Sequence, residues 1–182
     1  RCGLLAGFGK RTGRQAMNGN LDVVWYAIAT GAGATLVMDL WMFLRKRLFG
    51  IAALDYALVG RWFAYLPRGR FRHAPIAASP AISGERVIGL LAHYVSGIVF
   101  AGLLFVAFGI QWIERPTLGP ALIVGMGSVA APFLLMQPGM GMGIAARLTA
   151  RPALARLNSA ITHAVFGVGL YIAGWTMKAM HA

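Results

Sequence analysis

Residues 22–47 read DVVWYAIATGAGATLVMDLWMFLRKR, and this stretch decides the fold. A run of about 20 apolar residues is long enough for a helix to cross the roughly 30 Å hydrocarbon core of a bilayer. The run stops at three consecutive basic residues, which is how membrane helices end at the cytoplasmic surface. We therefore predict a first membrane span over about residues 22–44.

Three later stretches have the same character and predict spans over about residues 87–110, 118–137 and 157–177. Hydrophobic residues make up 58% of the chain and charged residues 12%, whereas about 25% of a soluble domain is charged. The mean hydropathy is +0.67. The fold class predicted is an all-α polytopic membrane protein, a four-transmembrane-helix bundle in one domain over residues 17–182. Because Met17 lies just before the first predicted span, residues 1–16 are set apart as an N-terminal segment that is a tail, an added segment or a misassigned start.

Two segments fit neither a span nor a simple loop. Residues 51–66 (IAALDYALVGRWFAYL) are apolar and aromatic, but they are short and carry Asp55 and Arg61. They predict an interfacial or re-entrant helix in the first long loop. Residues 138–146 (PGMGMGIAA) contain three glycines, each of which disfavours a continuous helix by about 1 kcal/mol.

The net charge of +12 does not indicate a nucleic-acid-binding protein, because the basic residues cluster in loops between apolar stretches. Of the 17 Lys and Arg residues, 11 lie in the two long loops. The positive-inside rule then places these loops in the cytoplasm and both termini on the periplasmic side of an inner membrane. The expected partner is a bilayer with anionic headgroups, and a homo-oligomer is compatible with the sequence. The residues predicted to contact headgroups are Arg45, Lys46, Arg47, Arg68, Arg70 and Arg72.

The predicted spans carry polar side chains at a common depth. Asp39, His93 and His163 each lie six or seven residues from a basic residue at the cytoplasmic end of their span, which is roughly 10 Å along a helix. Each also lies on a stripe of small residues at i+4 spacing, the face that packs inward in membrane bundles. Gln137 closes the third span on the same side. These residues predict one polar site of Asp39, His93, Gln137 and His163.

Three interpretations of this site stay open. The side chains could form interhelical hydrogen bonds that only hold the bundle together, which makes the chain a structural or partner-binding subunit. They could bind and pass a proton or ion in a transport or relay protein, because histidine titrates near neutral pH. His93, His163 and Asp39 could also bind a divalent metal ion, since two histidines and a carboxylate form a facial triad. Haem is disfavoured, because nothing beyond the paired histidines supports it.

Several segments resemble one family of bacterial multi-pass membrane proteins. They are GATLVMDLWMFLRKRLFG (33–50), LDYALVGRW (54–62), LPRGRFRH (66–73), GERVIGLLAHY (84–94), APFLLMQPGMGMGIAA (131–146) and LNSAITHAVFGVGLY (157–171). The chain is similar, over about residues 20–178, to the family catalogued as domain of unknown function 2938. The resemblance implies a bacterial inner-membrane protein. It implies no activity, so no functional role passes from the family to the four polar residues.

Overall fold

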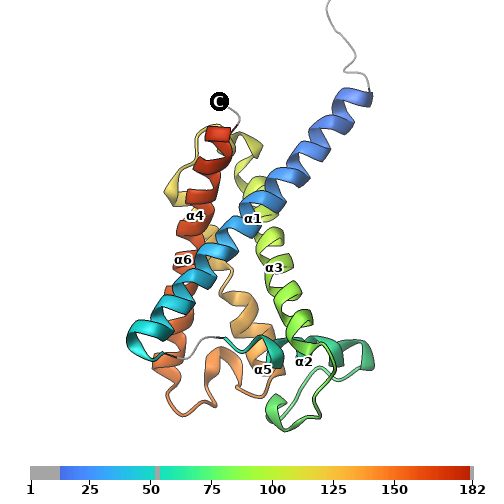
Figure 1. Ribbon diagram of the computed structural model, residues 1–182, viewed down its shortest axis with the longest axis vertical. Helices are drawn as coiled ribbons and strands as arrows, with labels where there is room; N and C mark the ends of the chain where they lie inside the picture. Colours follow the sequence, from blue (N-terminus) through green and yellow to red (C-terminus); the bar gives the residue numbers. More distant parts are fainter. Residues whose placement is uncertain (1–12, 52–53, 181–182) are drawn as a thin grey trace, which may run out of the picture.

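A computed structural model describes residues 13–51 and 54–180, with side chains from residue 22 onward (Figure 1). Within these ranges the chain is helical, without a strand, and it has four helices long and apolar enough to cross a membrane. These span-length segments are Asp22–Phe49, Glu85–Phe108, Leu118–Gly139 and Pro152–Met180. The predicted all-α class with four span-length helices is therefore confirmed. Residues 1–12 of the predicted tail lie outside the described residues.

The helices follow one another along the chain, with long connections after α2 and α5 and shorter ones elsewhere. They are α1 (Gly13–Phe49), α2 (Tyr56–Tyr65), α3 (Glu85–Phe108), α4 (Leu118–Gly127), α5 (Gln137–Gly139) and α6 (Pro152–Met180). The second span was predicted to within two residues at each end. The fourth begins five residues earlier than predicted, at Pro152, because proline is well suited to the first turn of a helix.

The ends of α1 and α2 follow from local chemistry. Gly50 adopts a positive φ of 66° directly after α1, the usual glycine position beyond a helix C-terminus. Lys46 and Arg47 in the last turn interact favourably with the negative end of the helix dipole. At the start of α2, the Asp55 side chain accepts a hydrogen bond of 2.9 Å from the backbone N–H of Ala57. The segment predicted as an interfacial or re-entrant helix thus contains a capped helix.

The third span-length segment is irregular. After α4 the chain passes through a turn into a π-helical stretch at Pro132–Met136, which leads into α5. Proline has no backbone N–H and its ring clashes with the preceding turn, so the regular hydrogen-bond ladder is broken there. Beyond Gly139 the helix stops, and Gly141 and Gly143 both have positive φ angles. The expectation that residues 138–146 do not continue the helix is confirmed.

Close approaches at glycine hold the long helices together. α1 packs against both α3 and α6, and α6 also packs against α4 (Figure 1). A Cβ added to Gly31 of α1 would lie 2.5 Å from the Cα of Ile98 in α3. A Cβ added to Gly169 of α6 would lie 2.8 Å from the carbonyl oxygen of Ala34 in α1. Small residues therefore allow backbone contact, as in membrane helix pairs.

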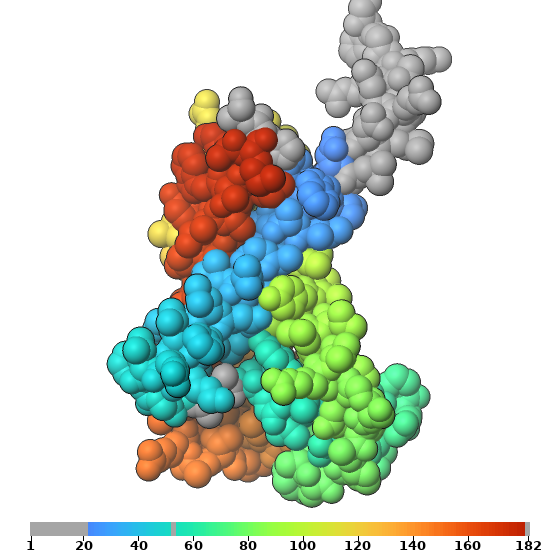
Figure 2. All heavy atoms as spheres, viewed as in Figure 1, coloured from blue at the N-terminus to red at the C-terminus, as the bar shows by residue number. Residues whose placement is uncertain are grey.

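The outer surface of the long helices is apolar. Many large hydrophobic side chains are exposed, among them Leu36, Val95, Val106 and Leu135 (Figure 2 shows one face). In the third span-length segment, only 17% of the most apolar stretch is buried inside the protein, so most of it lies on the surface. Such a large apolar surface is not typical of a water-soluble monomer.

The two long connections form a common layer at one end of the bundle. Tyr65, Ile76 and Met140 build a second small core there, separate from the main core between the long helices. The backbone N–H of His73 donates to the carbonyl of Gly139 at 2.9 Å, and Ile76 donates to Met140 at 3.1 Å. We name this layer, residues 54–84 with 137–149, the basal layer.

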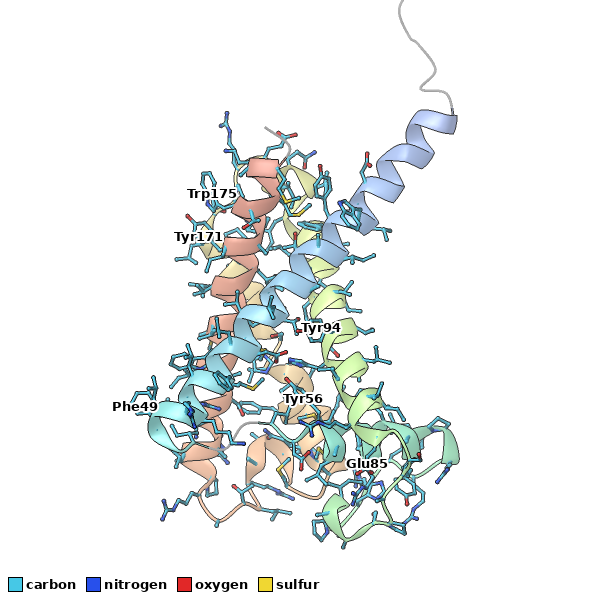
Figure 3. The ribbon with its side chains drawn as sticks, viewed as in Figure 1. Phe49, Tyr56, Glu85, Tyr94, Tyr171 and Trp175 are labelled. Carbon is cyan, nitrogen blue, oxygen red and sulfur yellow. The ribbon has the colours of Figure 1, made fainter. Side chains whose placement is uncertain are left out.

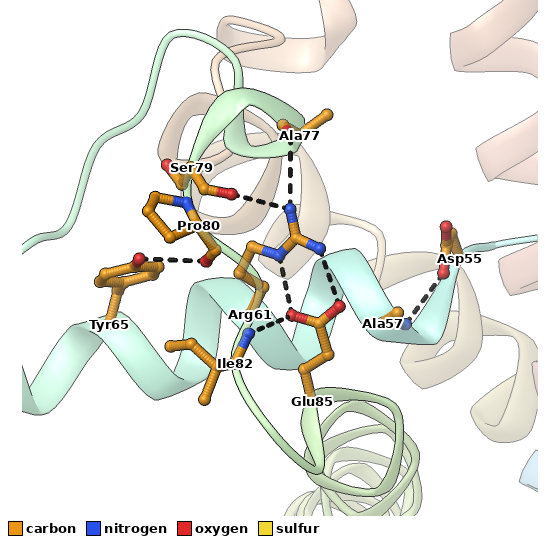
Figure 4. A network of polar contacts seen from close by, with 9 residues as sticks. All are labelled: Asp55, Ala57, Arg61, Tyr65, Ala77, Ser79, Pro80, Ile82 and Glu85. Atoms are coloured by element: carbon orange, nitrogen blue, oxygen red, sulfur yellow. Dashed lines mark hydrogen bonds and ion pairs between the residues drawn. The ribbon is translucent and has the colours of Figure 1, made fainter.

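An ion pair joins α2 to the start of α3 within the basal layer (Figure 4). Arg61 donates two hydrogen bonds of 2.8 Å, one to each carboxylate oxygen of Glu85. It donates a third, of 2.9 Å, to the carbonyl of Ser79. The hydrogen bonds to Glu85 raise the pKa of the Arg61 guanidinium. The same arginine therefore orders both α2 and the loop that leads into α3.

We expect Arg61→Ala to lower the thermal unfolding temperature of the detergent-solubilised protein by several degrees. The reason is that this change removes the loop carbonyl's donor and leaves the Glu85 carboxylate with only the backbone N–H of Ile82 as a donor. Unfolding followed by tryptophan fluorescence is the measurement. Arg86→Ala, at the adjacent exposed position, is the matched control and should leave the temperature unchanged. An equal effect of both substitutions would contradict the assigned role of the ion pair.

Candidate functional site

Three side chains from two helices donate hydrogen bonds to the carboxylate of Asp39. The hydroxyl of Tyr56 in α2 lies 2.5 Å from Oδ1, and Nε2 of His93 in α3 lies 3.0 Å from the same oxygen. The hydroxyl of Tyr94 lies 3.1 Å from Oδ2. Figure 3 shows Tyr56 and Tyr94 in this region, between α1, α2 and α3. We call Asp39, Tyr56, His93 and Tyr94 the Asp39 cluster.

Glycines bring the elements of this cluster together. A Cβ on Gly60 of α2 would overlap the carbonyl oxygen of Glu85, and one on Gly89 of α3 would overlap that of Tyr56. The two helices therefore touch along their backbones. This contact places the Tyr56 ring 5.1 Å from the His93 ring, centroid to centroid. On α3, Gly97 lies against the side chain of Thr35, one turn before Asp39 on α1.

The hydrogen bonds define where the protons lie. An ionised carboxylate only accepts, so the two tyrosines and Nε2 of His93 must donate. Burial, together with the hydrogen bond to Asp39, raises the pKa of Tyr56, and its hydroxyl stays protonated. His93 therefore carries a proton on Nε2. Its Nδ1 makes no hydrogen bond to any residue the structure describes, and in the neutral ring this atom holds a lone pair.

His163 of α6 forms a second polar pair with Ser128. Its Nδ1 lies 2.7 Å from the Ser128 hydroxyl, whose oxygen is also 2.6 Å from the carbonyl of Gly125. Ser128 has one hydroxyl proton, and the bond to the carbonyl uses it. The simplest assignment then puts the imidazole proton on Nδ1 and leaves a lone pair on Nε2 of His163. That nitrogen, too, has no hydrogen-bond partner in the described part of the chain.

The two histidines are close enough to interact electrostatically. Each uses one ring nitrogen for a hydrogen bond within the protein and leaves the other available to a proton, a water molecule or a ligand. This arrangement can accept and release protons, since imidazole changes its protonation near neutral pH and carboxylate and hydroxyl groups adjoin it.

The structure brings the predicted residues together in part. Asp39 and His93 are in direct contact, whereas His163 bonds to Ser128. Gln137 is buried, but it makes no side-chain bond to the other three, and its Oε1 has no partner among the described residues. In the same residues no group of three or more His, Cys, Asp or Glu side chains is arranged to hold a metal ion. Metal binding by His93, His163 and Asp39 stays a prediction.

The residues predicted to contact lipid headgroups differ in exposure. Lys46, Arg47 and Arg72 are exposed. Arg68 and Arg70 are exposed as well, and their guanidinium groups lie 5.4 and 5.1 Å from the centre of the Tyr65 ring. Arg45 is buried, with 7% of its surface exposed. Five of the six basic side chains are thus accessible to a partner.

Reasoning from the sequence missed Tyr56, Tyr94 and Ser128. A signal for Tyr56 exists, because it stands four residues before Gly60, just as His93 stands four residues after Gly89. Where two helices meet at glycines, the residues four positions away on the same helix faces also come close to each other. No comparable signal singles out Tyr94 or Ser128, since each lies off the small-residue stripe that identified the histidines.

Fold and site together define an all-helical protein with four span-length helices and a polar cluster between them. The chain belongs to the family described as protein of unknown function DUF2938, whose profile matches residues 28–177. All four predicted polar residues lie within the matched range, and the resemblance noted in the sequence is confirmed. No curated protein and no solved structure matches the chain.

Proposed function

We propose that this chain is a multi-pass protein of the bacterial inner membrane in which Asp39, His93 and His163 relay protons from the cytoplasmic side. The basal layer and its arginines face the cytoplasm, and the termini face the periplasm. The basis for this orientation is the excess of Lys and Arg in the two long loops. α2 then lies at the cytoplasmic interface, where its aromatic side chains suit the headgroup region.

One structural observation supports the proposed proton relay. A carboxylate and two imidazoles lie near each other between span-length helices, and each imidazole leaves one nitrogen without a partner in the described structure. Ionisable side chains at membrane depth cost several kcal/mol, and they commonly mark ion pathways. The described buried polar atoms that lack a partner include neither of these nitrogens, so both are accessible to a water molecule or a ligand.

The test is proton flux into proteoliposomes that contain an internal pH-sensitive dye, driven by a potassium diffusion potential. Native protein should carry protons faster than protein-free vesicles. Asp39→Asn removes the ionisable carboxylate with little change in size, so it should reduce the flux at least tenfold.

Ser96→Ala is the matched control, because Ser96 lies on α3 close to His93 but is exposed and bonds only to the carbonyl of Ala92. It should conduct like the native protein. A proton flux of the native protein no greater than that of protein-free vesicles would contradict the proposal. So would an Asp39→Asn protein that stays folded and conducts normally. Either result leaves the cluster as an interhelical lock in a structural or partner-binding subunit.

A second candidate is a metal or cofactor site, and one contact favours it. Histidine ligands of metals usually donate their other N–H to a carboxylate, as His93 does to Asp39. His93 Nδ1 and His163 Nε2 would then be the metal-binding atoms. Elemental analysis of protein purified without chelators distinguishes the two functions. A stoichiometric divalent metal that is lost in His163→Ala would support this candidate over the relay.

A further inference from the structure

Arg45 differs from its basic neighbours at the end of α1. Lys46 and Arg47 point outward and are exposed, whereas Arg45 faces α6 and retains 7% of its accessible surface. Contacts with other protein residues alone are enough to bury this side chain. A buried guanidinium requires a compensating anion or a full set of hydrogen-bond acceptors, since it remains charged.

The described residues provide very little compensation. The guanidinium makes one long hydrogen bond, 3.4 Å from Nη1 to Oδ1 of Asn158 in α6. Its Nε is buried without an acceptor. One turn earlier on the same face, the indole N–H of Trp41 is also buried without an acceptor. One face of α1 therefore carries two buried N–H donors without an acceptor, Nε of Arg45 and Nε1 of Trp41. The charged guanidinium has only the one long hydrogen bond to Asn158.

No acidic side chain of the protein neutralises Arg45. The chain has five Asp and Glu residues, and all lie elsewhere. They are in the Asp39 cluster, in the ion pair to Arg61, at the start of α2 and, for Asp22 and Glu114, at the beginning of the first span-length segment and in the connection after α3. Asp22 is 23 residues before Arg45 on one helix, which is about 35 Å. Within the described part of the chain, Arg45 therefore has no compensating anion.

We propose that Arg45, Trp41 and Asn158 form a binding site for one phosphate group, a function separate from the proton relay. The planar guanidinium suits the oxygens of a phosphate, to which it donates two parallel hydrogen bonds. The Trp41 indole and the Asn158 amide supply further N–H donors. In the bound state the guanidinium would exchange its long contact with Asn158 for the phosphate. The phosphate belongs to an anionic phospholipid headgroup or to a soluble phosphate compound.

The test measures the unfolding temperature of delipidated protein in detergent with three additives. They are phosphatidylglycerol, a phosphate-free glycolipid and inorganic phosphate. We expect phosphatidylglycerol to raise the temperature by several degrees and the glycolipid to have no such effect, because ligands that bind the folded state stabilise it. A rise with inorganic phosphate alone would assign the site to a soluble compound. No response to either phosphate source would overturn the proposal.

Substitutions at and away from Arg45 test whether the phosphate binds at this site. Arg45→Gln should bind the phosphate source at least about tenfold more weakly, since charged hydrogen bonds contribute the most. Arg151→Gln removes one exposed charge from the same end of the protein and should keep the native response. If Arg45→Gln does not fold, Trp41→Phe removes only the indole donor and should weaken the response. A native response in both Trp41→Phe and Arg45→Gln, or a loss in Arg151→Gln, would contradict the site.

Discussion

Gly89→Ala is expected to detach α2 from α3 and to reduce the free energy of unfolding by about 3 kcal/mol or more. The added Cβ would overlap the backbone carbonyl of Tyr56, and a backbone atom has no alternative rotamer. Gly60→Ala should act in the same way, because its Cβ would overlap the carbonyl of Glu85. Thermal or denaturant unfolding in detergent gives the change.

The control lies on the same helix. Gly102 of α3 has no atom within 4 Å of an added Cβ, so Gly102→Ala should be neutral or stabilising by up to about 1 kcal/mol, the ordinary gain of alanine in a helix. If Gly89→Ala and Gly102→Ala unfold alike, the tight contact between α2 and α3 is wrong. The position of Tyr56 in the Asp39 cluster would then be wrong as well.

Asp39→Ala is the second substitution with a large expected effect, a loss of about 3 kcal/mol of stability, because three part-buried donors lose their acceptor. It removes the acceptor for both tyrosine hydroxyls and for Nε2 of His93. Each buried donor left without a partner costs about 1–3 kcal/mol. Asp39→Asn retains an oxygen acceptor and should lose less, so stability should follow the order native, Asp39→Asn, Asp39→Ala.

Asp22→Ala provides the comparison for this series, because Asp22 lies on the same helix and is exposed. It should change the stability by less than about 0.5 kcal/mol. If Asp39→Ala were as harmless as Asp22→Ala, the hydrogen bonds of the cluster would contribute nothing to the folded state. Such a result would also remove the structural basis for the relay, since the geometry of the histidine depends on this carboxylate.

Hydropathy alone was sufficient for the four span-length helices, because a run of about 20 apolar residues has few alternatives to a buried or membrane helix. The break at Gly139 was also predictable from its run of glycines. The π-helical stretch at Pro132 was not predicted. A proline within an apolar run allows several local adjustments, and neighbouring packing selects one of them.

The candidate site was predictable where it depends on helix periodicity. Asp39 and His93 meet because both lie on small-residue stripes at a similar depth, and that was visible in the spacing. Tyr56 was not found, although its spacing to Gly60 is a signal, because that signal points to Asp39 only once the docking of α2 on α3 is known. The direction of His163 toward Ser128 was also hidden, since Ser128 follows the end of α4, where the helical period no longer applies.

The basal layer has a consequence for the order in which the protein matures. Residues 73 and 76 are tied by backbone hydrogen bonds to residues 139 and 140, more than sixty positions later in the chain. During synthesis the first long connection therefore cannot reach its final conformation until the third span-length segment is complete. The loop that carries residues 73 and 76 must wait for that segment, whereas α2 can dock on α3 earlier, because Gly60, Gly89 and the Arg61–Glu85 ion pair all precede the third segment.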